Sequence, residues 1–187
     1  VSPNPPTFQP NIKEFSEKIT AKTKAVIINN PNNPTGVVYS EDTIKELAKV
    51  LCDKQEEFGT AIYLISDEPY RELAYDGVDV PYLTKYYANT IVGYSYSKSL
   101  SLPGERIGYL IANSEMKDFE KMMFALNVAN RVAGFVNANS LFQRVIPYCL
   151  DCKVDIEVYN RNRIDLYNKL TMCKTCGSVL YVPSNTD

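Results

Sequence analysis

The feature that most constrains the fold of this chain is the alternation of short apolar runs with longer segments of helical periodicity. The runs are rich in β-branched residues and predict four buried strands, at residues 25–28, 62–66, 90–94 and 107–112. Apolar residues recur at helical spacing in five other segments, at residues 11–20, 40–51, 114–126, 136–150 and 154–170. Strands that alternate with helices imply a largely parallel, helix-covered sheet. We therefore expect an α/β fold of three layers, in which a mostly parallel sheet carries helices on both faces.

The charge balance excludes some classes of partner. The 187 residues include 20 Lys and Arg against 22 Asp and Glu, which gives a net charge of −2 without a basic block. This argues against nucleic acid or an anionic membrane as the main partner, and no stretch approaches the roughly 18 apolar residues of a membrane span. The chain opens without Met and without a secretory signal, so we expect a piece excised from a longer protein.

The residue types that are missing restrict the chemistry. The chain has no His and no Trp, so a Ser-His-Asp triad or a His-rich zinc site is impossible. Acid–base work falls to Lys, Asp, Glu, Tyr or Cys. Five cysteines without a signal fit a reducing compartment better than a secreted disulfide scaffold, so we predict a cytoplasmic protein.

Polar residues follow each of the first three predicted strands. They are amides, acids, hydroxyls and one amine: Asn32 and Asn33, Asp67 and Glu68, and Ser95, Ser97 and Lys98. Ligands of open α/β sheets bind beyond the carboxyl ends of the strands, so these residues predict one shared polar site. The alternative interpretation is that they simply mark strand ends.

The types of these residues favour one kind of chemistry. A Lys at the end of a buried strand, such as Lys98, is partly desolvated and is a Schiff-base candidate. A carboxylate on the neighbouring strand, Asp67, can keep a cofactor nitrogen protonated, and this pairing is the signature of pyridoxal 5'-phosphate (PLP) chemistry. Arg106 follows a Pro-Gly turn that returns it toward Lys98, and a planar guanidinium suits a phosphate.

Three motifs together resemble the class I/II aminotransferases of the fold-type-I PLP family. They are Asn30-Pro-Asn-Asn-Pro-Thr-Gly36, Asp67-Glu-Pro-Tyr70 and Ser95-Tyr-Ser-Lys-Ser-Leu-Ser-Leu-Pro-Gly-Glu-Arg-Ile-Gly108. They occur in the family's order between residues 30 and 108, and the flanking helical segments extend the likeness to nearly the whole chain. The resemblance implies the large domain of a PLP-dependent transferase, present in part, and transfer of an amino group from an amino acid to a 2-oxo acid.

The resemblance also implies a role for each site residue. Lys98 would form the internal aldimine and shuttle the proton, Asp67 would pair with the pyridine nitrogen, and Tyr70 and Asn33 would hydrogen-bond the ring 3-oxygen. Ser95 and Arg106 would hold the phosphate, with help from Ser97. We expect no metal. The competing interpretations are that Asn33 only shapes a turn, that Tyr70 only packs a surface, and that Arg106 only pairs with Glu105 or Glu72.

The family pattern extends beyond this chain at both ends. The small-residue phosphate loop, the aromatic residue that stacks on the cofactor and the arginine for the substrate carboxylate are expected outside residues 1–187. We predict that residues 1–150 are part of the PLP-binding large domain and that residues 151–187 are a connecting helix and the truncated start of a small domain. A homodimer is expected of the full-length protein.

Three alternatives to an aminotransferase remain open. One is a lyase, because the Ser-Leu-Pro-Gly turn after Lys98 also resembles the aminocyclopropane-carboxylate synthases. Another is a PLP-binding regulator domain that does not turn over. The third is a zinc-stabilised module, because Cys149 and Cys152 precede Cys173 and Cys176 at the spacing of a four-thiolate site. A helix over 154–170 would be about 25 Å long and would hold the two cysteine pairs apart.

Overall fold

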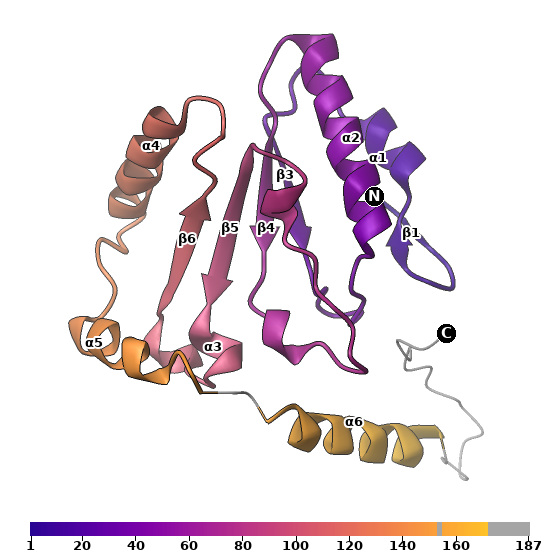
Figure 1. The fold of residues 1–187 in the computed structure, drawn as a ribbon, viewed down its shortest axis with the longest axis vertical. Helices are drawn as coiled ribbons and strands as arrows, with labels where there is room; N and C mark the ends of the chain where they lie inside the picture. The colour runs from indigo at the N-terminus through magenta and orange to yellow at the C-terminus, as the bar shows by residue number, and fades with distance from the viewer. Residues whose placement is uncertain (153–154, 172–187) are drawn as a thin grey trace.

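A four-stranded sheet forms the centre of the computed structural model, which describes residues 1–152 and 155–171 (Figure 1). The strand order is β3-β4-β5-β6, with β3 at Ala25–Asn29, β4 at Tyr63–Asp67, β5 at Thr90–Ser95 and β6 at Gly108–Ala112. The first three strands are parallel and β6 runs antiparallel to β5. The four predicted strands and the mostly parallel sheet are thus confirmed.

The remaining elements surround this sheet. A small antiparallel pair, β1 (Pro3–Asn4) and β2 (Gln9–Pro10), precedes it. The helices are α1 (Ile12–Lys18), α2 (Glu41–Phe58), α3 (Tyr96–Ser99), α4 (Phe119–Val132), α5 (Ser140–Cys149) and α6 (Ile156–Thr171). Three single 3-10 turns connect them: η1 (Arg71–Leu73), η2 (Leu83–Lys85) and η3 (Pro103–Glu105).

Helix α2 shows how the sequence sets an element. The Ser40 hydroxyl accepts a hydrogen bond from the Thr43 N–H at 3.1 Å, which satisfies a free donor of the first turn. Gly59 ends the helix in the left-handed region with a φ of 63°, where a residue without a side chain is favoured. The predicted stripe of Ile44, Leu47, Ala48 and Leu51 is buried. The helix therefore begins and buries its apolar face as the sequence predicts, but it continues to Phe58, beyond the predicted segment of residues 40–51.

Two predicted helices begin later than expected. The segment predicted to be helical from residue 114 becomes α4 only at Phe119, because Asn113 caps a turn at Glu115 and Asp118 has a φ of 58°, outside helical geometry. The segment predicted from residue 136 becomes α5 only at Ser140, since Val136 has a φ of 47° and Asn139 caps the helix. Periodicity alone did not detect these local turns.

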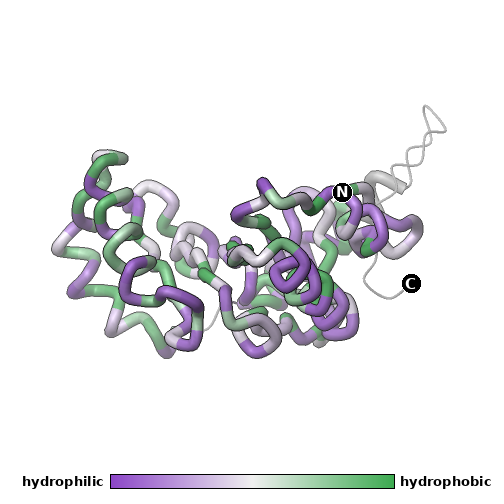
Figure 2. The backbone as a smooth tube through the Cα atoms, turned by 90° about the horizontal axis from the view of Figure 1, so that it is seen from above, coloured by the Kyte–Doolittle hydropathy of each residue, from purple (hydrophilic) through white to green (hydrophobic). Residues whose placement is uncertain are grey.

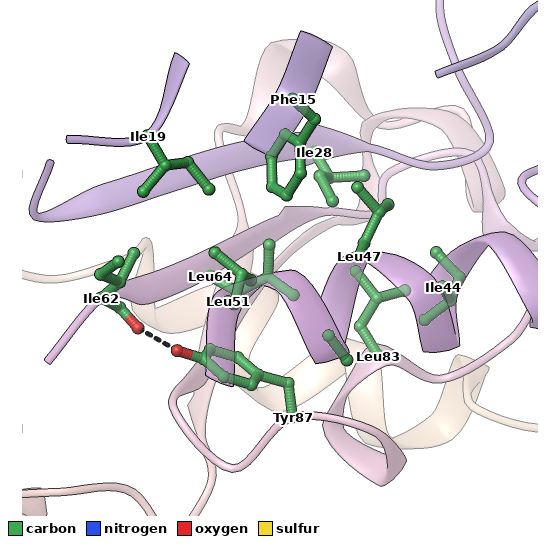
Figure 3. Packing of buried hydrophobic residues seen from close by; sticks show 11 residues of the cluster. Phe15, Ile19, Ile28, Ile44, Leu47, Leu51, Ile62, Leu64, Leu83 and Tyr87 are labelled. Atoms are coloured by element: carbon green, nitrogen blue, oxygen red, sulfur yellow. Dashed lines mark hydrogen bonds between the residues drawn. The ribbon is translucent and has the colours of Figure 1, made fainter. Parts of the chain in front are cut away.

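The hydrophobic core lies on one face of the sheet, beneath α1 and α2 (Figure 3). Phe15 of α1 and Leu51 of α2 pack over Ile28 of β3 and Leu64 of β4. Tyr87 closes the cluster, and its hydroxyl donates to the Ile62 carbonyl oxygen at 2.6 Å. Helices α1 and α2 thereby form the layer on this face.

Helices α4 and α5 belong to the opposite side of the molecule (Figure 1). Met123 and Leu126 of α4 face Gly93 and Leu110 of the sheet across a hollow of about 550 Å³. None of the described residues of α4 is buried. Figure 2 shows hydrophobic positions in these helices at the left as well as around the core at the right. Both faces therefore carry helices, as predicted, but only one is closely packed.

The described helices include none that is both long and apolar enough to cross a membrane. The described cysteines, Cys52, Cys149 and Cys152, are free. Cys173 and Cys176 lie outside the described residues, so the zinc alternative is not tested. Helix α6 does occupy most of the spacer that was expected to separate the two cysteine pairs.

Candidate active site

The site begins where the three parallel strands end. In the register of the sheet, Asn29 of β3 lies opposite Asp67 of β4, and Asp67 lies opposite Gly93 of β5. The side-chain amide of Asn29 donates to Asp67 Oδ2 at 3.0 Å and to the Asp67 carbonyl oxygen at 3.1 Å. The polar ends of neighbouring strands therefore meet at one edge of the sheet, as the sequence predicts.

Asn33, Tyr70 and Lys98 line one cavity of about 430 Å³ beyond this edge. The Asn33 Nδ2 donates to the Tyr70 hydroxyl oxygen at 2.8 Å, and the Lys98 Nζ lies 5.6 Å from the centroid of the Tyr70 ring. These residues come from three separate motifs that are 28 or more positions apart. The fold thus brings an amide, a phenol and a primary amine to one cavity.

Asp67 and Ser95 line the neighbouring hollow between the sheet and α4. Asp67 is connected to the Asn33 cavity through Asn29, whose Oδ1 accepts the Asn33 N–H at 2.7 Å. Ser95 caps α3, with its Oγ accepting the Ser97 N–H at 3.2 Å and lying 2.7 Å from Ser97 Oγ. The two hydroxyls therefore stand together at the end of β5, directly before Lys98.

Lys98 is more open to solvent than the sequence implied. It was expected at the end of a buried strand and partly desolvated, but its side chain is exposed. The reason is local, because β5 ends at Ser95 and the chain turns at once into α3. Lys98 therefore lies on a helical turn beyond the sheet edge rather than on the strand.

Two predicted site residues, Ser97 and Arg106, line neither the cavity nor the hollow described above. Ser97 is bonded to Ser95, whereas Arg106 lies apart from the other site residues. Arg106 is exposed, has a φ of 51°, and its Nη1 donates to the Pro103 carbonyl oxygen at 2.8 Å. Two residues further on, position 108 requires a glycine for a steric reason, because a Cβ there would collide with the Tyr94 carbonyl oxygen. The glycine of this motif lets β6 pass close to β5.

Three tyrosines support the segment that carries Lys98. The Tyr94 and Tyr109 rings are stacked with centroids 5.0 Å apart, and the Tyr96 ring meets both of them edge-on. The Tyr94 hydroxyl donates to Ser99 Oγ at 2.7 Å. Burial raises the pKa of Tyr94 and Tyr109, so both hydroxyls stay neutral. This cluster fixes α3 against the sheet without adding charge.

A buried ion pair holds the turn that carries Tyr70. Glu68 is 2% exposed, accepts from Ser66 Oγ at 2.6 Å and pairs with the Arg71 guanidinium at 2.5 Å. Arg71 also donates to the Val80 carbonyl oxygen at 2.7 Å and lies over the Tyr82 ring at 3.8 Å. Tyr70 lies between the two members of this pair, so its backbone is fixed on both sides.

Helix α6 passes below the carboxyl ends of the parallel strands (Figure 1). It contributes Arg163 to the same cavity that Asn33, Tyr70 and Lys98 line. Arg163 pairs with Asp76 at 3.0 Å and lies over the Tyr75 ring at 5.0 Å. Burial raises the pKa of the Tyr75 phenol, and the nearby guanidinium partly opposes this. The sequence analysis gave Arg163 no role, since it lies 65 residues beyond the motif of Lys98.

Asn29 is the other residue that the sequence analysis missed. The predicted strand ended at residue 28, and attention passed to Asn32 and Asn33 beyond it. A signal was available, because Asn29 and Asp67 directly follow two apolar runs expected to pair in parallel. Aligning the ends of those runs places the two residues opposite each other.

The comparisons with known proteins agree with this arrangement. Residues 2–149 match the model of the family described as aminotransferase class I and II. The chain is 38% identical over 130 residues to an aspartate aminotransferase from Pyrococcus horikoshii, covering 69% of this chain and 32% of that protein. It is 32% identical over 177 residues to histidinol-phosphate aminotransferase 2 from Haemophilus influenzae, covering 93% of this chain and 44% of that protein.

A solved structure extends the likeness to three dimensions. An amino transferase from Eubacterium rectale superposes with a TM-score of 0.88 at 51% identity, covering 91% of this chain and 43% of that one. The chain thus spans less than half the length of each of these relatives. The family model matches residues 2–149, which are most of this chain. The chain therefore belongs to the class I and II aminotransferases.

Proposed function

We propose that the protein is a PLP-dependent aminotransferase that moves an amino group from an amino acid to a 2-oxo acid. The observation that carries this proposal is the convergence of Asn33, Tyr70 and Lys98 in one cavity, beside an Asp67 that is connected to them through Asn29. Family membership supports the same reaction.

The donor set at this edge of the sheet fits PLP group by group. The cofactor presents a ring nitrogen, a ring 3-oxygen, an aldehyde and a phosphate. The chain offers the Asp67 carboxylate, the Asn33 and Tyr70 donors, the Lys98 amine, and the paired hydroxyls of Ser95 and Ser97. Each cofactor group therefore has a residue of matching chemistry at this edge.

The chain's own residues then divide the work. When bound, PLP supplies an electron sink for the pair of electrons left at the substrate α-carbon. Lys98 Nζ would hold the aldehyde and would later carry the proton from the substrate α-carbon to the cofactor C4′. Asp67 keeps a proton on the ring nitrogen, while Asn33 and Tyr70 donate to the 3-oxygen. Ser95 and Ser97 bind the phosphate together with Arg106, whose exposed guanidinium is free to turn from its Pro103 contact.

The test is a covalent map of the lysine that holds the cofactor, in the protein as its complete reading frame encodes it. Borohydride reduction followed by peptide mapping is expected to leave the pyridoxyl label on Lys98. A matched control is Lys85→Ala, because Lys85 also lies beside a tyrosine ring, 5.5 Å from the centroid of Tyr82, outside the cavity. We expect Lys98→Ala to abolish labelling and turnover and Lys85→Ala to retain both. A label on another lysine would overturn the site.

The substrate is the finer part of the proposal. The relatives named above act, by their names, on aspartate and on histidinol phosphate, so the family likeness alone selects neither. The relatives named above are all aminotransferases, which supports transamination over the lyase and regulator alternatives. We also propose a homodimer, with residues 1–150 in the cofactor-binding large domain and residues 151–187 in the connecting helix and the start of a small domain. Sedimentation equilibrium tests the dimer.

A further inference from the structure

We infer that Asn29 is a positioning residue that orients both Asp67 and Asn33. One side chain thereby places the two residues that are assigned to opposite ends of the cofactor ring. This inference rests on the proposed function, because it assigns Asp67 to the ring nitrogen and Asn33 to the ring oxygen. Asn29 itself has no role in the reaction described above. Its contacts carry the argument.

The Asn29 amide uses both of its chemical functions. Its Nδ2 donates to Asp67 Oδ2 at 3.0 Å and to the Asp67 carbonyl oxygen at 3.1 Å, while its Oδ1 accepts the Asn33 N–H at 2.7 Å. A carboxamide carries its donor and its acceptor on separate atoms, so this one side chain can donate in one direction and accept in the other. The side chain therefore joins two strand ends and the first turn of the Asn33 loop.

The consequence for Asp67 is a fixed carboxylate. The donor on Oδ2 holds one oxygen, which leaves Oδ1 as the acceptor for a ring N–H. No other side-chain hydrogen bond to the Asp67 carboxylate is found among the described residues. Without Asn29, this exposed carboxylate would turn freely, and binding would have to order it.

The consequence for Asn33 is a fixed loop. The bond from the Asn33 N–H anchors the backbone of that residue, and its side chain then reaches the Tyr70 hydroxyl at 2.8 Å. A replacement that keeps an acceptor at position 29 would retain this anchor while losing the bond to Asp67. The two halves of the role are therefore separable.

The experiment compares two ligands on the cofactor-free protein encoded by the complete reading frame. One is PLP and the other is the carbocyclic analogue in which the ring nitrogen is replaced by C–H, so that it cannot pair with Asp67. Dissociation constants are measured by fluorescence titration. The wild-type protein is expected to prefer PLP by about 10-fold or more, the range of one hydrogen bond to a charged group.

Two variants then separate the contact of Asn29 with Asp67 from its contact with Asn33. Asn29→Leu is expected to reduce the preference for PLP to about 2-fold and to weaken the analogue as well, because both contacts are lost. Asn29→Asp is expected to reduce the preference equally but to keep the wild-type affinity for the analogue, because an oxygen still accepts the Asn33 N–H. The matched control is Asn113→Leu, whose side chain likewise both donates, to the Thr84 carbonyl oxygen, and accepts, from the Glu115 N–H, away from the site.

A general loss of structure would weaken both ligands alike and leave their ratio unchanged. An unchanged ratio in Asn29→Leu and Asn29→Asp would therefore overturn the inference. If Asn29→Leu does not fold, the ratio in Asn29→Asp decides alone. A wild-type protein without any preference would overturn the role of Asp67 and of Asn29 together, whereas the borohydride label on Lys98 tests the proposed function separately.

Discussion

Ile27 and Ile28 are neighbours in β3, yet 71% of one and 7% of the other is exposed. Ile28 points toward α1 and α2, where the core is filled, and Ile27 points to the side of α4. The same alternation separates Asp67 from Glu68 at the end of β4. Asp67 opens onto the hollow beneath α4, whereas Glu68 is buried with Arg71. In the part of the chain that the structure describes, one face of the sheet is thus closely packed and the other face is open.

The sharpest test of this comparison exchanges the two neighbouring carboxylates for amides. Asp67→Asn is expected to reduce turnover by about 100-fold to 1000-fold, the range of a removed electrostatic group, and to leave the free energy of unfolding within about 0.5 kcal/mol. Glu68→Gln is expected to lower that free energy by about 3 kcal/mol, since it breaks a buried ion pair. Steady-state kinetics and urea denaturation measure the two effects. Equal loss of stability in both variants would show that the two faces do not differ.

The second test truncates the two neighbouring isoleucines. Ile28→Ala is expected to lower the free energy of unfolding by about 3 kcal/mol, because it removes buried methylene and methyl groups and leaves a cavity beneath α2. Ile27→Ala is expected to lower it by less than about 1 kcal/mol, since most of that side chain is already exposed. Urea denaturation of both variants gives the comparison. A similar loss in each would mean that the α4 face is covered in the folded protein.

Periodicity predicted the helices and strands on both faces, although α4 and α5 begin later than predicted, and this is as far as local sequence reaches. The stripe on α2 and the Ser40 cap are local, so they were found. The reversal of β6 and the open hollow beneath α4 depend on how distant segments meet, which periodicity does not contain. At the site, the motifs located Asp67, Tyr70 and Lys98, but Asn29 and Arg163 required the sheet register and the path of α6.

A third test asks whether Arg106 binds the phosphate of the cofactor. Arg106→Lys is expected to raise the dissociation constant for PLP by about 10-fold while changing turnover of the loaded enzyme little, because a point charge replaces a bidentate fork. Absorbance titration of the cofactor-free protein measures this. The test matters because the Arg106 guanidinium donates to the Pro103 carbonyl oxygen in the structure and must turn away from it to reach a phosphate. An unchanged affinity would make Arg106 a residue that only shapes the η3 turn.

The smallest expected effect lies on the packed face and depends on pH. Burial raises the pKa of Tyr87 from 10.0 to about 12, and its hydroxyl donates to the Ile62 carbonyl oxygen at 2.6 Å (Figure 3). Between these two pH values an unfolded Tyr87 loses its proton while the folded one retains it. The stabilisation is therefore fully present below pH 10 and is lost as the pH rises through about 12.

Tyr87→Phe removes both the hydrogen bond and this titration. At pH 8 we expect the variant to be less stable than the wild type by about 1 kcal/mol, the usual contribution of one hydrogen bond. The difference between the two proteins is expected to shrink above pH 10, because only the wild type loses stability through Tyr87. Comparing the two proteins cancels the titration of the other tyrosines, so urea denaturation at pH 8, 10 and 11 is sufficient. A difference that stays constant over this range would mean that Tyr87 titrates alike in the folded and unfolded chains, and that the packed face is more open to water than its burial indicates.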